Sequence, residues 1–375
     1  MKKYTQCVHS GSYKDDVTKG VNTPIFTSSS FGYLDTPENI YPRYFNTPNQ
    51  KSVVIKLCAL ENAEDGLLFS SGMAAISTVI FSLLSSGDHV VLQRDIYGGT
   101  HHFVTADFER FGIEYTFVSN NTEEIEQAVK KNTRVIYIET PSNPLLRITD
   151  IEAVAQIAKP HNIVTIIDGT FATPVNQNPL DLGIDIVVHS GTKYIGGHSD
   201  LCCGAVLTSQ YLAQNIRASA ANFGGSLNAL TCYLIERSLK TLGIRVEKQS
   251  RNALFIAQKL QKNPKIKKVY YPGLDNHEGF DIARKQMSAF GGMLSFELDE
   301  QTTDTDKFLR NLHLIKPALS LGGVETIICS PATTSHAKIS PAERAELGIM
   351  DGLLRLSVGI EDGDDLLADI HRALG

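Results

Sequence analysis

Lys193 is the residue best placed for covalent chemistry, because it closely follows an apolar strand. The stretch Ile-Asp-Ile-Val-Val over residues 184–188 leads into His-Ser-Gly-Thr-Lys-Tyr-Ile-Gly-Gly-His-Ser-Asp over residues 189–200. Open α/β sheets bind ligands at the carboxyl ends of their parallel strands. A lysine there can form an imine with a carbonyl compound, and the hydroxyls of Ser190 and Thr192 can donate to a phosphate. Most single lysines are solvated surface charges, but these apolar, glycine-rich flanks favour the chemical role.

Two charged residues interrupt segments that are otherwise apolar. Asp168 stands in Thr-Ile-Ile-Asp-Gly-Thr over residues 165–170, and Arg355 stands in Leu-Leu-Arg-Leu-Ser-Val over residues 353–358. A carboxylate at a strand end can pair with the ring nitrogen of pyridoxal phosphate (PLP), but such residues are just as often helix caps or metal ligands. An arginine inside an apolar strand needs an anion, which is either a structural carboxylate or the α-carboxylate of a substrate.

Two glycine-containing turns also follow predicted strands. The sequence Phe-Ser-Ser-Gly-Met-Ala-Ala over residues 69–75 predicts a strand, a turn and a helix start, where free N–H groups can bind a phosphate. For this segment taken alone, an ordinary serine-capped turn is the better explanation. In Asp-Ile-Tyr-Gly-Gly-Thr over residues 95–100, Tyr97 can stack on an aromatic ring or be a half-buried turn residue. The chain has no G-x-G-x-x-G fingerprint and no Walker A loop, which disfavours a dinucleotide or nucleoside triphosphate site.

The elements that must position these residues alternate between short apolar strands and helices. Several strands are apolar on both faces, which indicates a mostly parallel sheet covered by helices on both sides. The predicted strands are Gly66–Ser70, His89–Arg94, Glu114–Val118, Arg134–Glu139, Ile163–Asp168, Ile184–His189 and Gly204–Thr208. The helices predicted between them are Met73–Leu84, Gly99–Phe111, Glu123–Lys130 and Asp150–Lys159.

The two ends of the chain follow other patterns. Residues 1–60 are rich in Gly, Pro, Ser and Thr and are expected to form an extended arm that packs on something else. Residues 210–262 are predicted to be almost entirely helical. A smaller α+β domain is expected after them, with the strands Lys268–Tyr271, Met293–Glu297, Leu319–Leu321, Thr326–Cys329 and Leu353–Val358 and a last helix, Gly363–Leu374.

Length and composition limit the function classes. A chain of 375 residues suits two domains, and a 42% hydrophobic content fits a globular protein with a sizeable core. The net charge of −6 offers no basic surface for nucleic acid or an anionic membrane. No signal peptide, membrane span or metal-binding cysteine pair is apparent, so we expect a cytoplasmic protein with reduced thiols and no metal site.

Taken together, these motifs resemble the Cys/Met-metabolism family of PLP-dependent enzymes. This family includes cystathionine γ-synthase, cystathionine γ- and β-lyases, methionine γ-lyase and the O-acylhomoserine sulfhydrylases. The resemblance runs from Thr-Pro-Ile-Phe at residues 23–26 to Leu-Ser-Val-Gly-Ile-Glu-Asp at residues 356–362. Its most specific part is the stretch from Asp185 through Ser-Gly-Thr-Lys-Tyr at residues 190–194 to Gly-His-Ser at residues 197–199.

The resemblance implies PLP fold-type I, which is similar to aspartate aminotransferase. Residues 1–60 would form an arm that reaches the neighbouring subunit, residues 61–245 the large PLP-binding domain and residues 246–375 the C-terminal α+β domain. Such an arm implies an obligate dimer, paired into a homotetramer. The cofactor-binding set implied by the resemblance is Tyr41, Arg43, Gly72, Met73, Tyr97, Asn143, Asp168, Thr170, Ser190, Thr192 and Lys193.

The resemblance also implies individual roles. Lys193 would hold PLP covalently and act as the catalytic base, with Tyr97 stacking on the ring and assisting the leaving group. Asp168 would pair with the ring nitrogen, and Asn143 would lie near the ring hydroxyl. The phosphate would be bound by Gly72, Met73, Ser190 and Thr192, and by Tyr41 and Arg43 of the neighbouring subunit. The substrate carboxylate would be held by Ser320 and Arg355.

The reaction that this resemblance favours is carbon–sulfur elimination by a cystathionine γ- or β-lyase of cysteine and methionine metabolism. The alternatives are γ-replacement, as in cystathionine γ-synthase or O-acylhomoserine sulfhydrylase, followed by a methionine γ-lyase, an aminotransferase or a catalytically silent binding protein. The segments 320–325 and Ser335–Ala337 resemble both lyases and synthases and do not separate them.

Three departures from the family pattern accompany the resemblance. Gly169 stands where Asn is more usual, and Phe-Asn-Thr-Pro replaces Gly-Asn-Pro-Thr at residues 45–48. Gly99 stands where methionine γ-lyases typically have a cysteine, which argues against that member of the family.

Overall fold

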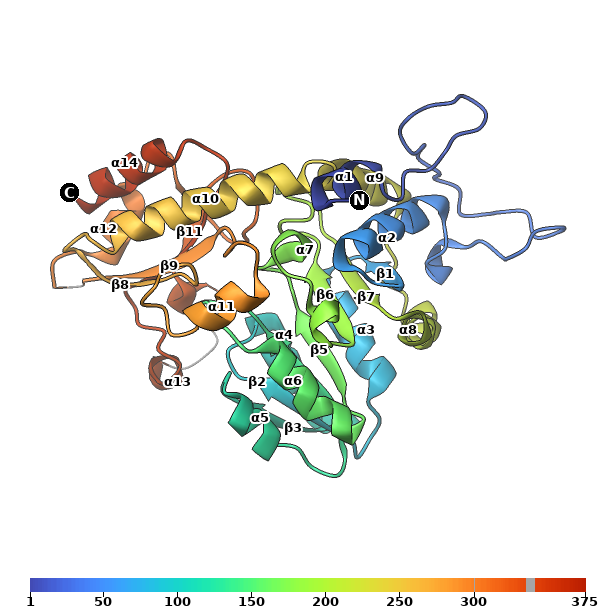
Figure 1. Cartoon of the computed structure of the whole chain (residues 1–375), viewed down its shortest axis with the longest axis horizontal. Helices are drawn as coiled ribbons and strands as arrows, with labels where there is room; N and C mark the ends of the chain where they lie inside the picture. Colours follow the sequence, from blue (N-terminus) through green and yellow to red (C-terminus); the bar gives the residue numbers. More distant parts are fainter. Residues whose placement is uncertain (300, 335–340) are drawn as a thin grey trace.

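A computed structural model describes residues 1–299, 301–334 and 341–375. Two β-sheets dominate the fold, and the long helix α10 (Leu242–Leu260) runs along one side of the molecule from the first half of the chain to the second (Figure 1). The predicted α/β fold of type I, with a mostly parallel sheet and a smaller α+β part, is confirmed. None of the helices in the described ranges combines the length and apolarity that a membrane span requires.

The larger sheet has seven strands in the order β1-β7-β6-β5-β4-β2-β3. All neighbours are parallel except β7, which is antiparallel to both β1 and β6. The strands are β1 (Asp65–Phe69), β2 (His89–Gln93), β3 (Glu114–Val118), β4 (Thr133–Glu139), β5 (Val164–Asp168), β6 (Ile186–Ser190) and β7 (Gly204–Thr208). All seven lie where the sequence predicts them, within two residues at each end.

The strands of this sheet are apolar on both faces because each face has its own core. On β2, Val90 and Leu92 pack into one cluster, whereas Val91 between them packs into the other. The first cluster contains residues of α3 (Gly72–Leu83), α4 (Gly98–Asp107) and α8 (Gln210–Phe223). The second contains residues of α5 (Thr122–Gln127) and α6 (Ile151–Ala158). Helices on both faces explain why period-2 alternation is absent from these strands.

The second sheet has five strands in the order β10-β11-β12-β9-β8. They are β8 (Ile266–Tyr270), β9 (Met293–Leu298), β10 (Lys316–Pro317), β11 (Ile327–Cys329) and β12 (Leu353–Ser357), and only the β10–β11 pair is parallel. The predicted strand at residues 319–321 is wrong. Ser320 has a φ of 80°, in the left-handed region, so the extended backbone is interrupted there.

The remaining helices complete the two layers. Helices α10, α12 (Thr305–Arg310) and α14 (Gly363–Leu374) pack on the second sheet through one apolar cluster. The other helices are α7 (Thr173–Asn176), α9 (Ala229–Leu239), α11 (Phe280–Gln286) and α13 (Pro341–Glu346). Short 3₁₀ helices are η1 (Pro42–Tyr44), η2 (Glu109–Phe111), η3 (Lys159–His161), η4 (Pro179–Leu182) and η5 (Pro331–Thr333).

The N-terminal 60 residues are less uniform than the sequence predicts. Residues 10–41, all of which the structure describes, form neither helix nor strand. However, α1 (Lys3–His9) and α2 (Pro48–Glu61) are helical, so the extended conformation expected for residues 48–60 is wrong. A capping box between Thr47 and Gln50 starts α2, and Val53 is among the fully buried residues of this helix. The arm and the boundary at residues 245–246, which falls within α10, stay predictions.

Gly204 on β7 allows the strand to approach the start of α3. A Cβ at Gly204 would lie 2.1 Å from the carbonyl oxygen of Ser71. We expect Gly204→Ala to lower the free energy of unfolding by about 1–3 kcal/mol, because strand and helix would have to separate. Thermal unfolding measures this change. Gly32→Ala is the matched control, since a Cβ at Gly32 would meet nothing within 4 Å; equal melting temperatures for both variants would contradict the prediction.

Candidate active site

Three neighbouring parallel strands end at the same edge of the larger sheet with polar residues. Strand β4 ends at Glu139, β5 at Asp168 and β6 at Ser190, and Glu139 is directly opposite Asp168 in the register. The chain then turns, with the backbone N–H of Lys193 donating to the carbonyl of Ser190 at 3.1 Å. The carboxyl edge of the sheet therefore gathers the predicted acid, hydroxyl and lysine in one place.

Lys193 meets the second half of the chain through Ser320. The Nζ of Lys193 donates to the Oγ of Ser320 at 2.6 Å. Burial, assisted by the positive charge of Arg355, lowers the pKa of Lys193 to about 8. Ser320 has a backbone conformation that L-residues rarely adopt, and such conformations persist where the surrounding structure enforces them, often at active sites.

Arg355 is a buried cation whose described partners are neutral acceptors. It is 5% exposed, and its Nη1 and Nη2 donate to the Oδ1 of Asn143 at 2.8 Å and to the carbonyl of Ser320 at 3.0 Å. Its Nε has no hydrogen-bond partner, and no carboxylate of the described ranges forms an ion pair with it. A buried guanidinium in this state suits an anionic ligand, because a carboxylate can supply the missing charge and acceptors.

Asp168 and Glu139 are buried acids on neighbouring strands. Burial raises the pKa of Asp168, and the N–H of Thr170, at 3.0 Å from its Oδ1, partly offsets that effect. Burial, together with the nearby Asp168, raises the pKa of Glu139 well above its usual range, which favours its neutral form. The Oε2 of Glu139 accepts from the backbone N–H of Tyr97 at 2.7 Å. The sequence analysis did not identify Glu139 as a site residue.

The start of α3 lies against Ser190. A Cβ at Gly72 would come within 2.9 Å of the Cβ of Ser190, so only glycine allows this approach. The Oγ of Ser71 accepts from the N–H of Ala74 at 3.1 Å, which leaves the N–H groups of Gly72 and Met73 without partners in the described structure. Free N–H groups at a helix start beside a serine hydroxyl provide the donors that a phosphate binds.

Two threonines hold the chain around Ser190 and Lys193 in place. The Oγ1 of Thr170 accepts from the N–H of Ser190 at 2.8 Å, which joins the ends of β5 and β6. The Oγ1 of Thr192 accepts from the N–H of Cys203 at 3.0 Å and lies 3.2 Å from the carbonyl of the same residue. Thr192 thus links the turn that contains Lys193 to β7, whereas Thr170 links Ser190 at the end of β6 to Asp168.

Tyr97 lies at the start of α4 and is 45% exposed. Its ring lies directly beside Gly99, where a Cβ would come within 2.4 Å of the ring carbon Cε1. The glycine therefore leaves the tyrosine ring room to lie in this position. Tyr97 is joined to the strand ends through its backbone bond to Glu139.

Tyr41 and Arg43 lie apart from this cluster. The guanidinium of Arg43 lies over the rings of Tyr41 and Tyr44, at 5.8 and 5.5 Å from their centroids, and donates to the carbonyl of Ala221. In the described part of the chain, no hydrogen bond joins either residue to the residues around Lys193. Their predicted role in a neighbouring subunit stays a prediction. The Ser335–Ala337 segment lies outside the described residues.

His189 and Glu61 form a buried pair that the sequence did not indicate, close to the turn that contains Lys193. The Nε2 of His189 lies 2.6 Å from the Oε1 of Glu61, and the two side chains are 2% and 0% exposed. A Cβ at Gly169 would come within 3.0 Å of the His189 ring, so the unusual glycine fits the close approach of this ring. No local pattern marks the pair, because Glu61 ends α2 and lies 128 residues from His189.

The residues at the sheet edge fit PLP by their chemistry. Asp168 supplies a carboxylate for a ring nitrogen, Lys193 an amine for an aldehyde, and the start of α3 with Ser190 supplies donors for a phosphate. The unpaired Nε of Arg355 adds a place for a carboxylate beside the lysine. These groups together match an aldehyde cofactor and an amino acid.

The chain matches the family described as "Cys/Met metabolism PLP-dependent enzyme" over residues 4–375. It is 46% identical to a cystathionine gamma-lyase of Bacillus subtilis (strain 168), covering 100% of this chain and 99% of that protein. It is also 46% identical to the cystathionine beta-lyase MetC of the same organism, covering 99% and 95%. A crystal structure of cystathionine gamma-lyase from Lactobacillus plantarum complexed with L-serine superposes with a TM-score of 0.96 at 41% identity, covering 100% and 98%.

The lowered pKa of Lys193 has a measurable consequence. Because the neutral amine reacts with an aldehyde, covalent binding of PLP by the cofactor-free protein should accelerate with pH and level off above about 8. A lysine with an ordinary pKa would keep accelerating to about pH 10. Stopped-flow absorbance of the lysine-bound cofactor measures the rate. Lys193→Ala is the control, and a covalent bond that forms in this variant would refute the assignment.

Proposed function

Because the chain belongs to the Cys/Met metabolism family of PLP-dependent enzymes, we propose that it is a carbon–sulfur lyase acting on L-cystathionine. The reaction consumes water and releases a keto acid, ammonia and a thiol amino acid. The observation that carries the proposal is Arg355, a buried cation without a carboxylate partner in the described ranges, close to the lysine amine. The identity of 46% to cystathionine γ- and β-lyases supports the choice of substrate.

Lys193 acts as the base of the reaction. PLP, when bound, supplies an electron sink that stabilises negative charge on the substrate α-carbon. Once its amine is free, Lys193 takes the proton from the substrate Cα with its Nζ. A pKa of about 8 leaves a useful fraction of neutral amine near pH 7 to 8, while the protonated form can return the proton. In a γ-elimination the same Nζ also removes a proton from Cβ.

Arg355 and Ser320 orient the substrate for this step. The guanidinium of Arg355 binds the α-carboxylate, and Ser320, which already bonds to both Arg355 and Lys193, keeps the carboxylate and the base close together. Tyr97 protonates the departing sulfur from the exposed side of the site. Holding base, carboxylate and leaving group in one geometry lowers the entropic part of the barrier.

The other site residues bind the cofactor in this proposal. Asp168 pairs with the ring nitrogen, and Thr170 holds Asp168 through its backbone N–H. The N–H groups of Gly72 and Met73 and the hydroxyls of Ser190 and Thr192 bind the phosphate. Asn143 is hydrogen-bonded to Arg355, so we assign it to the carboxylate side of the site as well as to the ring hydroxyl.

The direct test is to incubate the PLP-loaded protein with L-cystathionine alone and identify the keto acid by mass spectrometry. We expect 2-oxobutyrate from γ-elimination or pyruvate from β-elimination. Lys193→Ala controls for contaminating lyases. No keto acid from a fully PLP-loaded protein would contradict the lyase and favour γ-replacement, which needs an activated homoserine and a thiol.

We further propose that the protein is a homo-oligomer whose arm completes the partner's site. Residues 10–41 expose large apolar side chains, with Val17 91%, Val21 88% and Tyr33 73% exposed. Exposed apolar surface of this extent indicates an interface with another protein. In the proposed dimer, paired into a tetramer, Arg43 and Tyr41 reach the phosphate bound by the neighbouring subunit.

Hybrid oligomers test this proposal. Lys193→Ala and Arg43→Ala proteins should each lack activity, but a hybrid dimer contains one site with both residues intact. Equal mixing by co-expression should therefore restore about a quarter of the wild-type activity. Lys193→Ala mixed with Asp168→Ala is the matched control and should restore none, because both residues belong to the same subunit's site. No recovery with Arg43→Ala would refute the shared site.

A further inference from the structure

We propose that Arg147 and Asp95 form a clamp that positions Asn143, and through it Arg355, for binding of the substrate α-carboxylate. Neither clamp residue is assigned to the site above. The proposal rests on the proposed function only in taking Arg355 as the carboxylate-binding residue. Asn143 lies in a turn formed by residues 142–147, which we call the 142–147 turn.

The 142–147 turn is closed by hydrogen bonds between its two ends. The N–H of Ser142 donates to the carbonyl of Arg147 at 3.0 Å, and the N–H of Arg147 donates back to the Oγ of Ser142 at 3.2 Å. Leu146 between them has a φ of 56°, in the left-handed region. A non-glycine residue keeps such a conformation only when its surroundings enforce it, so the turn depends on what holds its ends.

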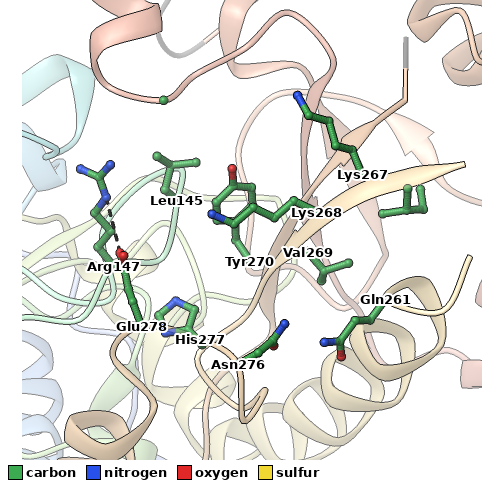
Figure 2. A pocket seen from close by; sticks show the side chains of 12 residues that line it. Leu145, Arg147, Gln261, Lys267, Lys268, Val269, Tyr270, Asn276, His277 and Glu278 are labelled. Carbon is green, nitrogen blue, oxygen red and sulfur yellow. Dashed lines mark ion pairs between the residues drawn. The ribbon is translucent and has the colours of Figure 1, made fainter. Parts of the chain in front are cut away.

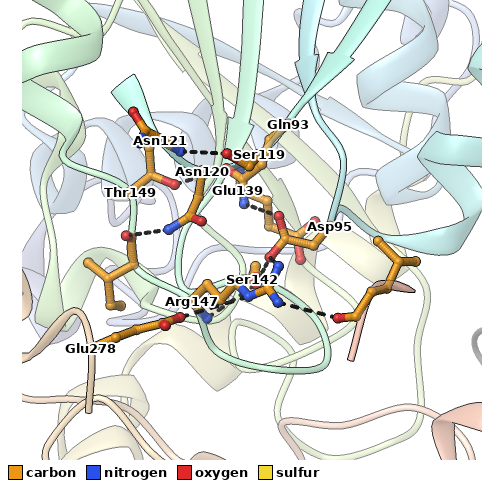
Figure 3. Close-up of polar contacts among 12 residues, drawn as sticks. Gln93, Asp95, Ser119, Asn120, Asn121, Glu139, Ser142, Arg147, Thr149 and Glu278 are labelled. Atoms are coloured by element: carbon orange, nitrogen blue, oxygen red, sulfur yellow. Dashed lines mark hydrogen bonds and ion pairs between the residues drawn. The ribbon is translucent and has the colours of Figure 1, made fainter. Parts of the chain in front are cut away.

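Asp95 is the anchor of these ends. Its Oδ2 accepts from the Oγ of Ser142 at 2.6 Å and lies 3.9 Å from the Nη1 of Arg147, while its Oδ1 accepts from the Nε2 of Gln93 at 2.9 Å (Figure 3). Asp95 is 5% exposed, and burial raises its pKa. Arg147 is its ion-pair partner among the described residues, so the guanidinium supplies the charge that favours the ionised carboxylate.

Gln93 extends the network to the edge of the sheet. Its Oε1 accepts from the backbone N–H of Glu139 at 3.3 Å and from the Oγ1 of Thr149 at 3.0 Å. The clamp is thereby fixed to the ends of β2 and β4, which are rigid elements of the larger sheet. Tyr97 follows Asp95 by two residues in the chain, so Asp95 is close in sequence to Tyr97 and hydrogen-bonded to the 142–147 turn.

Arg147 connects the turn to the second half of the chain. Its Nη2 donates to the carbonyl of Leu347 at 3.3 Å, and its Nε lies 3.8 Å from the Oε1 of Glu278. This outer side lines a cavity of about 510 Å³ beside β8, where Figure 2 shows Arg147 facing Glu278. Arg147 thus spans from Asp95, a buried acid just after β2, to the part of the chain that contains Arg355.

The position of the turn determines the geometry of the carboxylate site. Asn143 accepts from Arg355 at 2.8 Å, and the carbonyl of the next residue, Pro144, accepts from the Oγ of Ser295 at 2.7 Å. Ser295 is paired with Arg355 across β9 and β12. A turn that loosens would release the Asn143 side of the guanidinium and weaken binding of a carboxylate. It would not remove any group that binds a substrate amine.

Two ligands that differ only at the carboxylate test this role. PLP-loaded wild type and Arg147→Gln are titrated with L-alanine and with L-alaninamide, and the change in cofactor absorbance gives each dissociation constant. We expect Arg147→Gln to raise the constant for L-alanine roughly tenfold or more, the effect of losing a hydrogen bond to a charged group. The constant for L-alaninamide should change less than about twofold.

Further variants separate positioning from general stability. Arg147→Lys keeps the charge but not the fork of donors, so it should recover part of the L-alanine affinity. Asp95→Asn should act like Arg147→Gln, and the double variant should be little worse than either, because both disable one clamp. Arg355→Gln, which removes the positive charge, should weaken binding of L-alanine much more than binding of L-alaninamide. Arg134→Gln, which breaks an exposed ion pair with Asp88 near the start of β4, should change neither constant.

The two dissociation constants test the clamp without requiring turnover of a substrate. Equal weakening of both ligands by Arg147→Gln would show a general structural role and overturn the proposal, as would unchanged binding of both. If Arg147→Gln does not fold, Asp95→Asn carries the test, with the same two overturning results. A protein that makes no keto acid from cystathionine would refute the lyase but leave this binding comparison intact.

Discussion

The organisation of the site depends on two largely buried basic side chains, Lys193 and Arg355, that lie close together. Among the described residues, no carboxylate forms an ion pair with the guanidinium of Arg355. Arg355 donates to an amide and to a backbone carbonyl, and its charge adds to the effect of burial in lowering the pKa of Lys193 to about 8. A ligand that brings a negative charge would supply the partner that the guanidinium of Arg355 lacks in the described part of the chain.

The edge of the larger sheet, by contrast, buries two acids. Asp168 and Glu139 are buried on neighbouring strands, burial raises the pKa of both, and the nearby Asp168 raises the pKa of Glu139 further. A neutral Glu139 needs no partner charge, but Asp168 at the end of β5 benefits from a cation. A molecule with a protonated ring at one end and an amino acid carboxylate at the other satisfies both sides. This physical argument agrees with membership of a PLP-dependent family.

The two sides are contributed by different sheets, so the site depends on how these sheets are joined. The larger sheet supplies the acids, the hydroxyls and the lysine, and β12 of the smaller sheet supplies the guanidinium. Contacts that cross between them include Lys193 with Ser320, Asn143 with Arg355 and Arg147 with Leu347. Arg147 bridges this junction by contacting Asp95 on one side and Leu347 on the other, which is the basis for proposing that it positions the site.

The sequence by itself determined the strands of the larger sheet and the residues that follow them. Apolar runs and the glycines after them are local signals, and a residue directly after a parallel strand must lie at its carboxyl edge, so Asp168, Ser190 and Lys193 were predictable. The helix α2 was not predictable, because its buried side includes polar residues such as Asn49 and Lys56 and gives little periodic signal.

Only the tertiary structure decided which residues meet across the fold. The partner of Asn143 is 212 residues away, and that of His189 is 128 residues away. The role of Glu139 arises because its strand lies beside β5 in the register. Such pairs depend on sheet order and on packing between sheets, which no local pattern of residue types encodes. Local chemistry therefore indicated the cofactor, whereas three-dimensional packing decided which side chains are buried together and which partners they have.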